Sequence, residues 1–183
     1  MKQTITCFVA YEHENVGEVL FAVKRLPKRI KPESVSALKY MVSHCKTPYV
    51  LISAKPELLR FTAEALSHFC GLLANSKAMM AYSDYIDEHE DGSFTDHPLI
   101  DYTAGSVSDS FEFGKAVFVP LEAIRNFVSE STKSYSFAGV YAFRLWASRV
   151  GNILHVKEKL YTAVQEDKRR SGQKQFDYLN PQL

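Results

Sequence analysis

The sequence predicts an α/β sandwich built around a mostly parallel sheet. Short apolar runs rich in β-branched and aromatic residues alternate with segments whose apolar residues recur at helical spacing. Two of these runs, Tyr49–Ser53 and Ala78–Tyr82, are almost entirely apolar, which is typical of strands that a parallel sheet buries on both faces. Hydrophobic residues make up 46% of the 183 residues, enough for the core of a single domain, residues 1–183.

The first half of the chain predicts two strands and three helices. Thr4–Tyr11 is a run of β-formers and is expected to be a buried strand. Val16–Leu26 has apolar residues at helical spacing and predicts a helix. After a basic turn, a second helix is expected from Pro32 to about Cys45, because proline suits the first helical turn. Tyr49–Ser53 follows as a strand, and Pro56–Leu73 has helical spacing again.

The second half continues the alternation, ending in a charged tail from about Lys168 that we expect to be peripheral. Ala78–Ser83 is a strand, followed by an acidic loop with a turn at Asp91-Gly92. Beyond an irregular stretch, the expected elements are a strand at Phe113–Val119, helices at Pro120–Val128 and Gly139–Arg149, and strands at Ile153–Val156 and Leu160–Val164. We expect Thr4–Tyr11, Tyr49–Ser53 and Ala78–Ser83 to be adjacent central strands with helices on both faces.

Composition excludes several functional classes. The formal charge of +1 argues against an electrostatically driven nucleic-acid binder. Three scattered cysteines favour reduced thiols over a disulfide framework, and no stretch resembles a signal peptide or is long enough to cross a bilayer. We therefore expect a cytoplasmic protein without a transmembrane segment. The sequence has neither a Walker motif nor a dinucleotide-binding fingerprint.

Candidate binding residues lie where the expected strands end. Ligands of open α/β sheets bind beyond the carboxyl ends of the strands, which directs attention to Ala10–Glu12, Ser53–Lys55 and Ser83–Tyr85. Asp84 is the first candidate among these residues. The neighbouring carboxylates could ligate a hard cation, but charge runs in loops are more often solvated, and no histidine pair has metal-ligand spacing. No metal ligand is therefore assigned.

Several segments together resemble the inverting family 2 glycosyltransferases. The family has a Tyr-Ser-Asp-Tyr … Asp-Gly segment, matched here by Tyr82–Tyr85 and Asp91-Gly92. Further matches cover the chain from about Thr47 to its end: Pro98–Tyr102, Phe111–Gly114, Tyr141–Leu145, Leu160–Thr162, Glu166-Asp167 and Gln175–Tyr178. The resemblance implies a GT-A-like fold, a three-layer α/β/α sandwich with a mixed sheet that binds a nucleotide-sugar, with a UDP-sugar as the expected donor.

The resemblance also implies site residues. Phe8–Glu12 resembles the strand and turn where the nucleotide base docks, so Tyr11, Glu12, Lys55 and Asp84 are the expected nucleotide-sugar contacts. The carboxylates expected to include the catalytic base are Asp101, Glu166 and Asp167. The family's usual cofactor is a divalent cation, Mn²⁺ or Mg²⁺, which stabilises the departing diphosphate.

The chain departs from the family pattern at several places. Ser53-Ala54-Lys55 stands where the Asp-X-Asp metal motif is expected, so Lys55 is a candidate to supply part of the metal's charge. Gly139-Val140 replaces the Glu-Asp pair that carries the usual base, and Gln165 replaces a histidine. The 20 residues between Leu26 and Thr47 are too few for the further strand and helix of the donor half. The resemblance is to a shortened, divergent relative.

Two functions remain open at this stage. The first is a glycosyltransferase of the hexosyltransferase type that moves a sugar from a nucleotide donor to a glycan acceptor in bacterial polysaccharide synthesis. The second is a non-catalytic relative that uses the same fold to bind a glycan or a partner. The missing metal motif, missing base and shortened donor half favour the second function, while the matched segments favour the first.

Overall fold

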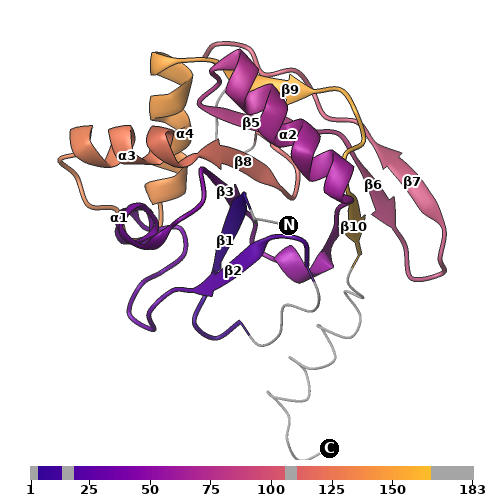
Figure 1. The fold of residues 1–183 in the computed structure, drawn as a ribbon, viewed down its shortest axis with the longest axis horizontal. Coiled ribbons are helices and arrows are strands. Elements are labelled where there is room, and N and C mark those ends of the chain that lie inside the picture. Colours follow the sequence, from indigo (N-terminus) through magenta and orange to yellow (C-terminus); the bar gives the residue numbers. More distant parts are fainter. Residues whose placement is uncertain (1–3, 14–18, 106–110, 166–183) are drawn as a thin grey trace, which may run out of the picture.

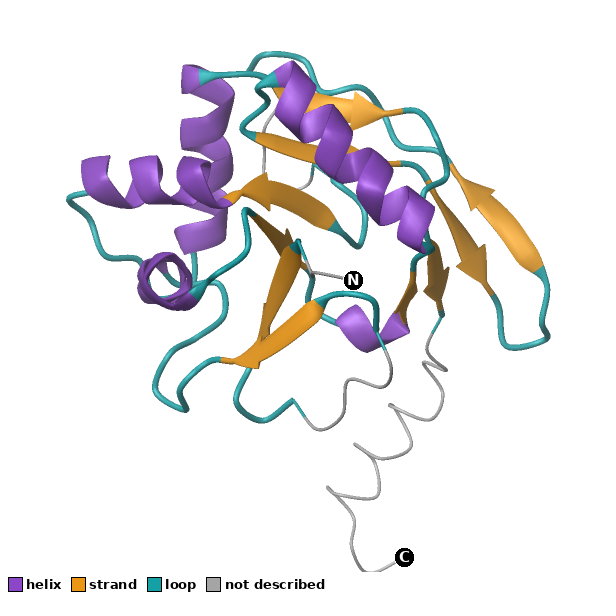
Figure 2. Cartoon of the chain, in the orientation of Figure 1, coloured by secondary structure: helices purple, strands orange, loops and turns teal. Residues whose placement is uncertain are grey.

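The computed structural model describes residues 4–13, 19–105 and 111–165 (Figures 1 and 2). The strands are β1 (Ile5–Val9), β2 (Ala22–Arg25), β3 (Tyr49–Ile52), β4 (Leu59–Arg60), β5 (Met80–Ser83), β6 (Tyr85–Glu88), β7 (Phe94–His97), β8 (Val117–Pro120), β9 (Ile153–Val156) and β10 (Thr162–Val164). The helices are α1 (Val35–His44), α2 (Ala63–Ser76), α3 (Leu121–Glu130), α4 (Gly139–Val150) and the short 3₁₀ helix η1 (Pro56–Leu58). These elements make the chain an α/β protein, as predicted.

The described residues form a main sheet with strand order β2-β1-β3-β8-β5-β9. Strand β8 pairs antiparallel with both β3 and β5, while the other pairs are parallel. The sheet is therefore mixed but mostly parallel. The prediction that Tyr49–Ser53 and Ala78–Ser83 are adjacent was wrong, because β8 lies between β3 and β5.

Helices cover both faces of the main sheet. On one face α1, α3 and α4 contact one another and pack over a core that includes Phe8, Val50 and Tyr82. On the other face α2 packs over a core that includes Cys7 and Leu51 (Figure 1). Neighbouring residues of one strand thus enter opposite cores, because strand side chains alternate between faces. This explains why the sequences of β1 and β3 are largely apolar; the exception in β1, Thr6, has a hydroxyl partner in Thr47 at 2.8 Å.

A second sheet has the strand order β4-β10-β6-β7, and its strands β6 and β7 occupy the region predicted to be an acidic loop. That loop prediction was wrong. Side chains of β6 alternate between buried positions, Tyr85 and Asp87, and partly exposed ones, and β6 pairs with β7 as a hairpin. The predicted turn was right: Gly92 has a φ of 79°, a conformation that favours glycine.

Two helix predictions also need correction. Within Val16–Leu26, residues 16–18 lie outside the described part of the chain, and Ala22–Arg25 form β2, because they pair in parallel with Thr6–Val9 of β1. The apolar residues at helical spacing also suit this edge strand, since Phe21 and Leu26 at its two ends are buried. The expected helix Pro56–Leu73 is divided into η1, β4 and α2, and the Thr62 hydroxyl caps α2 by accepting a hydrogen bond from the N–H of Ala65 at 3.1 Å.

The other predicted elements are confirmed within a few residues. Helix α1 begins at Val35 rather than Pro32, because Ser34 caps it by accepting a hydrogen bond from the N–H of Ala37 at 3.1 Å. The expected peripheral tail from Lys168 lies outside the described residues. Within the described part of the chain, the helices are all too short or too polar to span a bilayer.

The start of α4 must be a glycine, which gives a test of the helix layer. Gly139 donates its N–H to the carbonyl of Glu33 at 2.6 Å, and a Cβ at this position would overlap the backbone of Ser34 and Val35. We expect Gly139→Ala to lower the free energy of unfolding by about 1–3 kcal/mol, as overpacking does. Urea unfolding followed by circular dichroism measures this change.

Gly71→Ala is the matched control. Gly71 lies inside α2, and a Cβ there meets nothing within 4 Å. Because alanine has the higher helix propensity, this variant should be more stable by about 0.5–1 kcal/mol. Equal destabilisation by both substitutions would contradict the close approach of α4 to the start of α1.

Candidate functional site

The carboxyl ends of β1, β3, β5 and β9 lie at the same edge of the main sheet, because these strands are all parallel. Tyr11 and Glu12 follow β1, and Lys55 follows β3. Asp84 follows β5, and Lys157 follows β9. The sheet therefore brings all four predicted nucleotide-sugar contacts to one edge, where open α/β sheets bind ligands.

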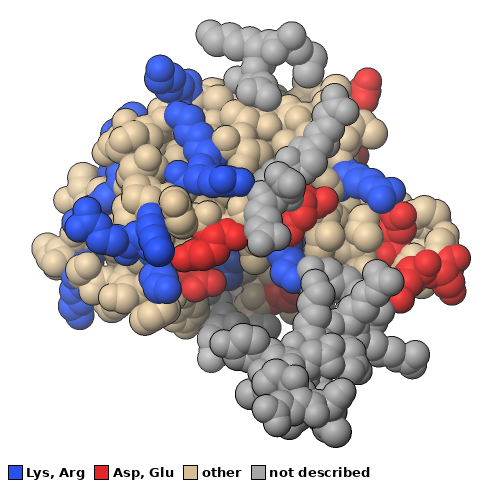
Figure 3. Space-filling model, turned by 90° about the horizontal axis from the view of Figure 1, so that it is seen from below, with Lys and Arg blue, Asp and Glu red and all other residues tan. Residues whose placement is uncertain are grey.

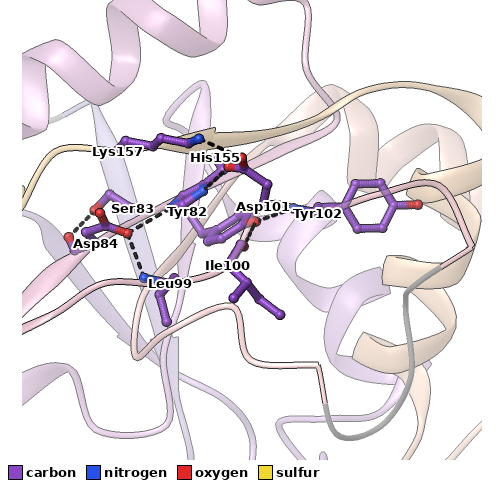
Figure 4. A network of polar contacts seen from close by, with 9 residues as sticks. All are labelled: Tyr82, Ser83, Asp84, Leu99, Ile100, Asp101, Tyr102, His155 and Lys157. Carbon is purple, nitrogen blue, oxygen red and sulfur yellow. Dashed lines mark hydrogen bonds and ion pairs between the residues drawn. The ribbon is translucent and has the colours of Figure 1, made fainter.

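Asp84 is fixed at this edge by backbone and side-chain hydrogen bonds (Figure 4). Its carboxylate oxygen Oδ1 accepts a hydrogen bond from the N–H of Leu99 at 2.8 Å and lies 2.8 Å from Nε2 of His155. Its own N–H donates to the carbonyl of Val156, and its carbonyl accepts from the N–H of Leu160. With only 15% of its side chain exposed, Asp84 is an anchor that joins the ends of β5 and β9 to the segment after β7.

His155 links Asp84 to Asp101, a predicted catalytic residue 17 positions further along the chain. Its second ring nitrogen, Nδ1, lies 2.7 Å from Oδ1 of Asp101, and only 5% of the side chain is exposed. Nζ of Lys157 lies 2.6 Å from the other oxygen of Asp101. Each ring nitrogen of His155 thus lies within hydrogen-bond distance of a carboxylate oxygen, and which nitrogen donates depends on the tautomer. Asp84, His155, Asp101 and Lys157, here called the charge row, form one chain of polar contacts.

Tyr82 packs against His155 of the charge row. Its ring stacks on the imidazole of His155, with centroids 4.6 Å apart and planes 1° from parallel. The Tyr82 hydroxyl donates to the carbonyl of Ile100 at 2.7 Å and accepts from the N–H of Tyr102 at 2.8 Å. Burial raises the pKa of Tyr82 to about 12, so the hydroxyl stays neutral and can make both bonds. Tyr82 therefore fixes the backbone on both sides of Asp101.

Asp101 is the exposed carboxylate of the charge row, with 55% of its side chain accessible, and Lys157 beside it is exposed as well. Its pKa is lowered mainly by the hydrogen bond from Lys157 and next by the one from His155. The same ion pair raises the pKa of Lys157. Asp101 is accordingly an ionised carboxylate, held in one orientation and open to solvent on one side.

The other predicted contacts gather at the ends of β1 and β3. Tyr11, Glu12 and Lys55 are exposed. The loops that carry them meet where Nε2 of His13 lies 2.8 Å from Oε2 of Glu57, an ion-pair distance without hydrogen-bond geometry. Adjacent strands at Tyr49–Ser53 and Ala78–Ser83 would bring Lys55 and Asp84 into one crevice, but that adjacency is wrong, because β8 separates β3 from β5.

Two predicted catalytic residues, Glu166 and Asp167, lie outside the described residues. Asp101 is therefore the one predicted catalytic carboxylate that the structure places near Asp84. His155 was missed, because its sequence neighbours show only a short strand. The feature that could have identified His155 is its position in that strand, because the strand pairs with β5 and places His155 opposite Tyr82.

A second histidine, His97, is also held between carboxylates. Its Nδ1 lies 2.7 Å from Oδ2 of Asp87, and its Nε2 lies 3.6 Å from Oε1 of Glu112. The ring of His97 stacks on that of Tyr85, with centroids 4.3 Å apart. Asp87, which was expected to be a solvated loop residue, is thus a buried partner of His97 at the base of the β6–β7 hairpin.

The described residues contain no set of ligands that fits a metal ion. No group of three or more His, Cys, Asp or Glu side chains within residues 4–13, 19–105 and 111–165 is arranged to hold an ion. The loop after β3 offers Ser53, Ala54 and Lys55, and only the serine has a side-chain oxygen. A divalent cation needs several oxygen ligands, so no step of the chemistry below is assigned to a metal.

The link between Asp84 and His155 gives a measurable coupling. We expect a double-mutant cycle of Asp84→Asn and His155→Phe to return a coupling energy of about 1.5–3 kcal/mol, because a buried, charged hydrogen bond is lost in each variant. Phenylalanine keeps the stacking on Tyr82, and asparagine still accepts from Leu99. Urea unfolding of the four proteins measures the coupling.

An exposed histidine–carboxylate pair provides the control. His68 and Glu158 are 3.1 Å apart, with 44% and 60% of their side chains exposed. The cycle of His68→Ala and Glu158→Gln should return a value close to zero, since water screens such pairs. A coupling at Asp84 and His155 no larger than this control would show that the charge row is not a stabilising unit.

The lowered pKa of Asp101 predicts a pH effect. The folded-state pKa lies below the unfolded value of about 3.9, so Asp101 contributes stability above that pH and loses its contribution as the pH falls through the folded value. Lys157→Gln should raise the pKa of Asp101, as measured by NMR titration of its carboxyl carbon. Lys159→Gln, which removes a lysine paired with Asp96, should leave the pKa of Asp101 unchanged. Equal shifts in both variants would contradict the assigned cause.

No family model matches the sequence, and no curated protein is significantly similar to it. The function is therefore inferred from the geometry of the chain's own residues.

Proposed function

We propose that this chain is a compact glycosyltransferase domain of the GT-A type that transfers a sugar from a nucleotide-sugar, a UDP-sugar in particular, to a glycan acceptor in bacterial polysaccharide synthesis. The observation that carries the proposal is the charge row at the ends of β5 and β9. It contains Asp84 of the Tyr82–Tyr85 motif and presents Asp101 to solvent beside it. A rigid, ionised carboxylate at the binding edge of an α/β sheet is what removal of an acceptor proton requires.

The architecture supports the proposal at the level of the whole domain. A GT-A-like domain is expected to be a mixed, mostly parallel sheet between two helix layers, and the main sheet has this form. Viewed from below, the Lys and Arg side chains in sight lie mostly on the α1 side of the molecule, and the Asp and Glu side chains lie both beside them near the middle and toward the β6–β7 hairpin (Figure 3).

In this proposal each site residue has its own role. Lys55, after β3, gives the diphosphate a cationic contact, which stabilises the negative charge that develops on the leaving group. Tyr11 and Glu12, after β1, contact the nucleoside. Asp101 accepts the proton of the acceptor hydroxyl, with Glu166 and Asp167 as the other candidates for this role. Asp84 acts as a positioning residue, because its Oδ1 already accepts two hydrogen bonds.

One observation favours a second function, a non-catalytic glycan- or partner-binding module. The hydrogen bond from Lys157 lowers the pKa of Asp101, and a carboxylate with a lowered pKa is a weaker base. The described residues also lack a metal-ligand group. A binding module would need the rigid edge of the sheet but no base.

Nucleotide binding tests the proposal. At a ligand concentration of 100 times the dissociation constant, UDP or a UDP-sugar should stabilise the folded chain by about 2.7 kcal/mol, seen as a thermal shift with and without Mn²⁺ or Mg²⁺. Lys55→Ala should weaken binding about 10- to 100-fold, because a charged hydrogen bond to phosphate is worth about 1.5–3 kcal/mol.

The matched control is Lys46→Ala. Lys46 is exposed and precedes β3, so it lies at the opposite edge of the sheet from Lys55. The Lys46→Ala variant should bind UDP as tightly as the parent protein does. No shift with UDP, GDP or their sugars would favour the binding module. A shift lost equally in both lysine variants would show that nucleotides bind through general charge rather than at the carboxyl edge.

A further inference from the structure

A cluster of exposed cations follows β2, which three strands of the main sheet separate from β5 and the charge row. Residues 19–48 contain seven Lys and Arg side chains and one carboxylate, Glu33, although the whole chain has a formal charge of only +1. Three of these cations, Lys28, Arg29 and Lys31, are exposed in the connection from β2 to α1. Among the described residues, no carboxylate lies at ion-pair distance from any of the three. The connection therefore attracts anionic partners and repels cationic ones.

Backbone hydrogen bonds hold this connection in a fixed shape. It begins with a turn in which Ile30 donates its N–H to the carbonyl of Pro27 at 2.8 Å, so the two residues at the tip of the turn are both cations. The N–H and the hydroxyl of Ser34 both donate to the carbonyl of Lys31, at 3.1 and 2.7 Å. Because the loop is already ordered, a partner that binds its cations does not have to order it first.

Two exposed aromatic residues lie in the neighbouring connection, from α3 to α4. The two connections meet where the N–H of Val35 donates to the carbonyl of Tyr135 at 3.0 Å (Figure 1). Tyr135 is 37% exposed and Phe137 is 70% exposed. A further exposed lysine precedes them in this connection, and in the described part of the chain it too has no carboxylate at ion-pair distance. Together these residues form the basic aromatic patch: Lys28, Arg29, Lys31, Lys133, Tyr135 and Phe137.

The combination of cations with apolar rings distinguishes between anionic partners. A small anion would contact the cations and leave the aromatic rings in water. A nucleic acid offers charge and stacking surfaces, but it follows an extended basic track, whereas these cations lie in two short connections. A bilayer with anionic head groups uses both features, because its surface attracts Lys and Arg and its head-group region accommodates aromatic rings. We propose that the basic aromatic patch docks the protein on a membrane surface that contains anionic lipid.

The position of the patch gives the docked protein an orientation. Strand β2 runs parallel to β1, so the connection that follows it lies at the carboxyl edge of the main sheet. Helix α4 begins at the same edge, since Gly139 and Val140 both donate to the carbonyl of Glu33. A membrane that contacts the patch therefore lies on the side of the sheet that carries Asp101. The proposal concerns the surface alone and does not rest on the proposed transfer reaction.

Co-sedimentation of the full chain with lipid vesicles tests the proposal. Vesicles of phosphatidylcholine and phosphatidylglycerol in equal amounts should bind the protein about tenfold or more tightly than phosphatidylcholine alone, and added salt should weaken this binding. The triple variant Lys28→Gln, Arg29→Gln, Lys31→Gln should weaken binding to the anionic vesicles about tenfold or more. Phe137→Ser should weaken it about three- to tenfold, because an inserted ring no longer leaves water.

The matched control removes three exposed cations at the opposite edge of the sheet, in the segments that precede β3, β5 and β9: Lys46→Gln, Lys77→Gln and Arg149→Gln. This second triple variant should bind the vesicles as the parent does, and circular dichroism verifies that each variant is folded. Three outcomes would overturn the proposal: no preference for anionic vesicles, equal losses in the two triple variants, or tighter binding to single-stranded DNA than to the vesicles. The thermal shift with UDP is measured separately, so vesicle binding and nucleotide binding can fail independently.

Discussion

The imidazole of His155 is the interaction on which the candidate site depends. It is buried between two carboxylates and stacked on Tyr82, so each contact restricts another. The segment from Pro98 to Tyr102 has no helix or strand of its own, and its place is set by Asp84, Tyr82 and His155. The cost of burying the polar imidazole is offset because each ring nitrogen has a carboxylate partner. An exposed carboxylate, Asp101, is thereby held as firmly as a residue of the sheet.

Much of the fold could be predicted from the sequence. The continuous apolar runs of β1, β3 and β5 and the helical spacing of α3 and α4 determine their structures locally, and all were predicted. The errors arose where pairing decides the structure. Residues Ala22–Arg25 fit a helix or a strand by spacing, and only the neighbouring β1 makes them a strand. The acidic stretch forms β6 because it pairs with β7, and the side chain of Asp87 contacts His97 of β7, ten positions away in the chain.

The candidate site was predictable in part, for a related physical reason. Asp84 was predicted from its position at the end of a strand, and Asp101 was predicted from the family resemblance. Neither prediction indicates that the two residues lie close together. They are joined by His155, which lies 71 residues beyond Asp84 in the chain. A spacing rule for helices cannot find such a residue, because the contact is made by the register of β5 against β9. For Lys55, the preceding strand β3 was predicted correctly, but the neighbour of that strand in the sheet was not.

The reversed direction of β8 has a consequence for biosynthesis. Strands β2, β1 and β3 form one part of the main sheet, and β5 and β9 form another, and among the described strands β8, Val117–Pro120, joins them. When β3 and β5 have emerged from the ribosome and Val117–Pro120 have not, β3 therefore has an open edge, and β5 has no partner in this sheet. Open apolar edges are sites of aggregation and of recognition by chaperones. The nascent chain passes through this exposed state until β8 is complete, and β5 acquires its second partner only with β9.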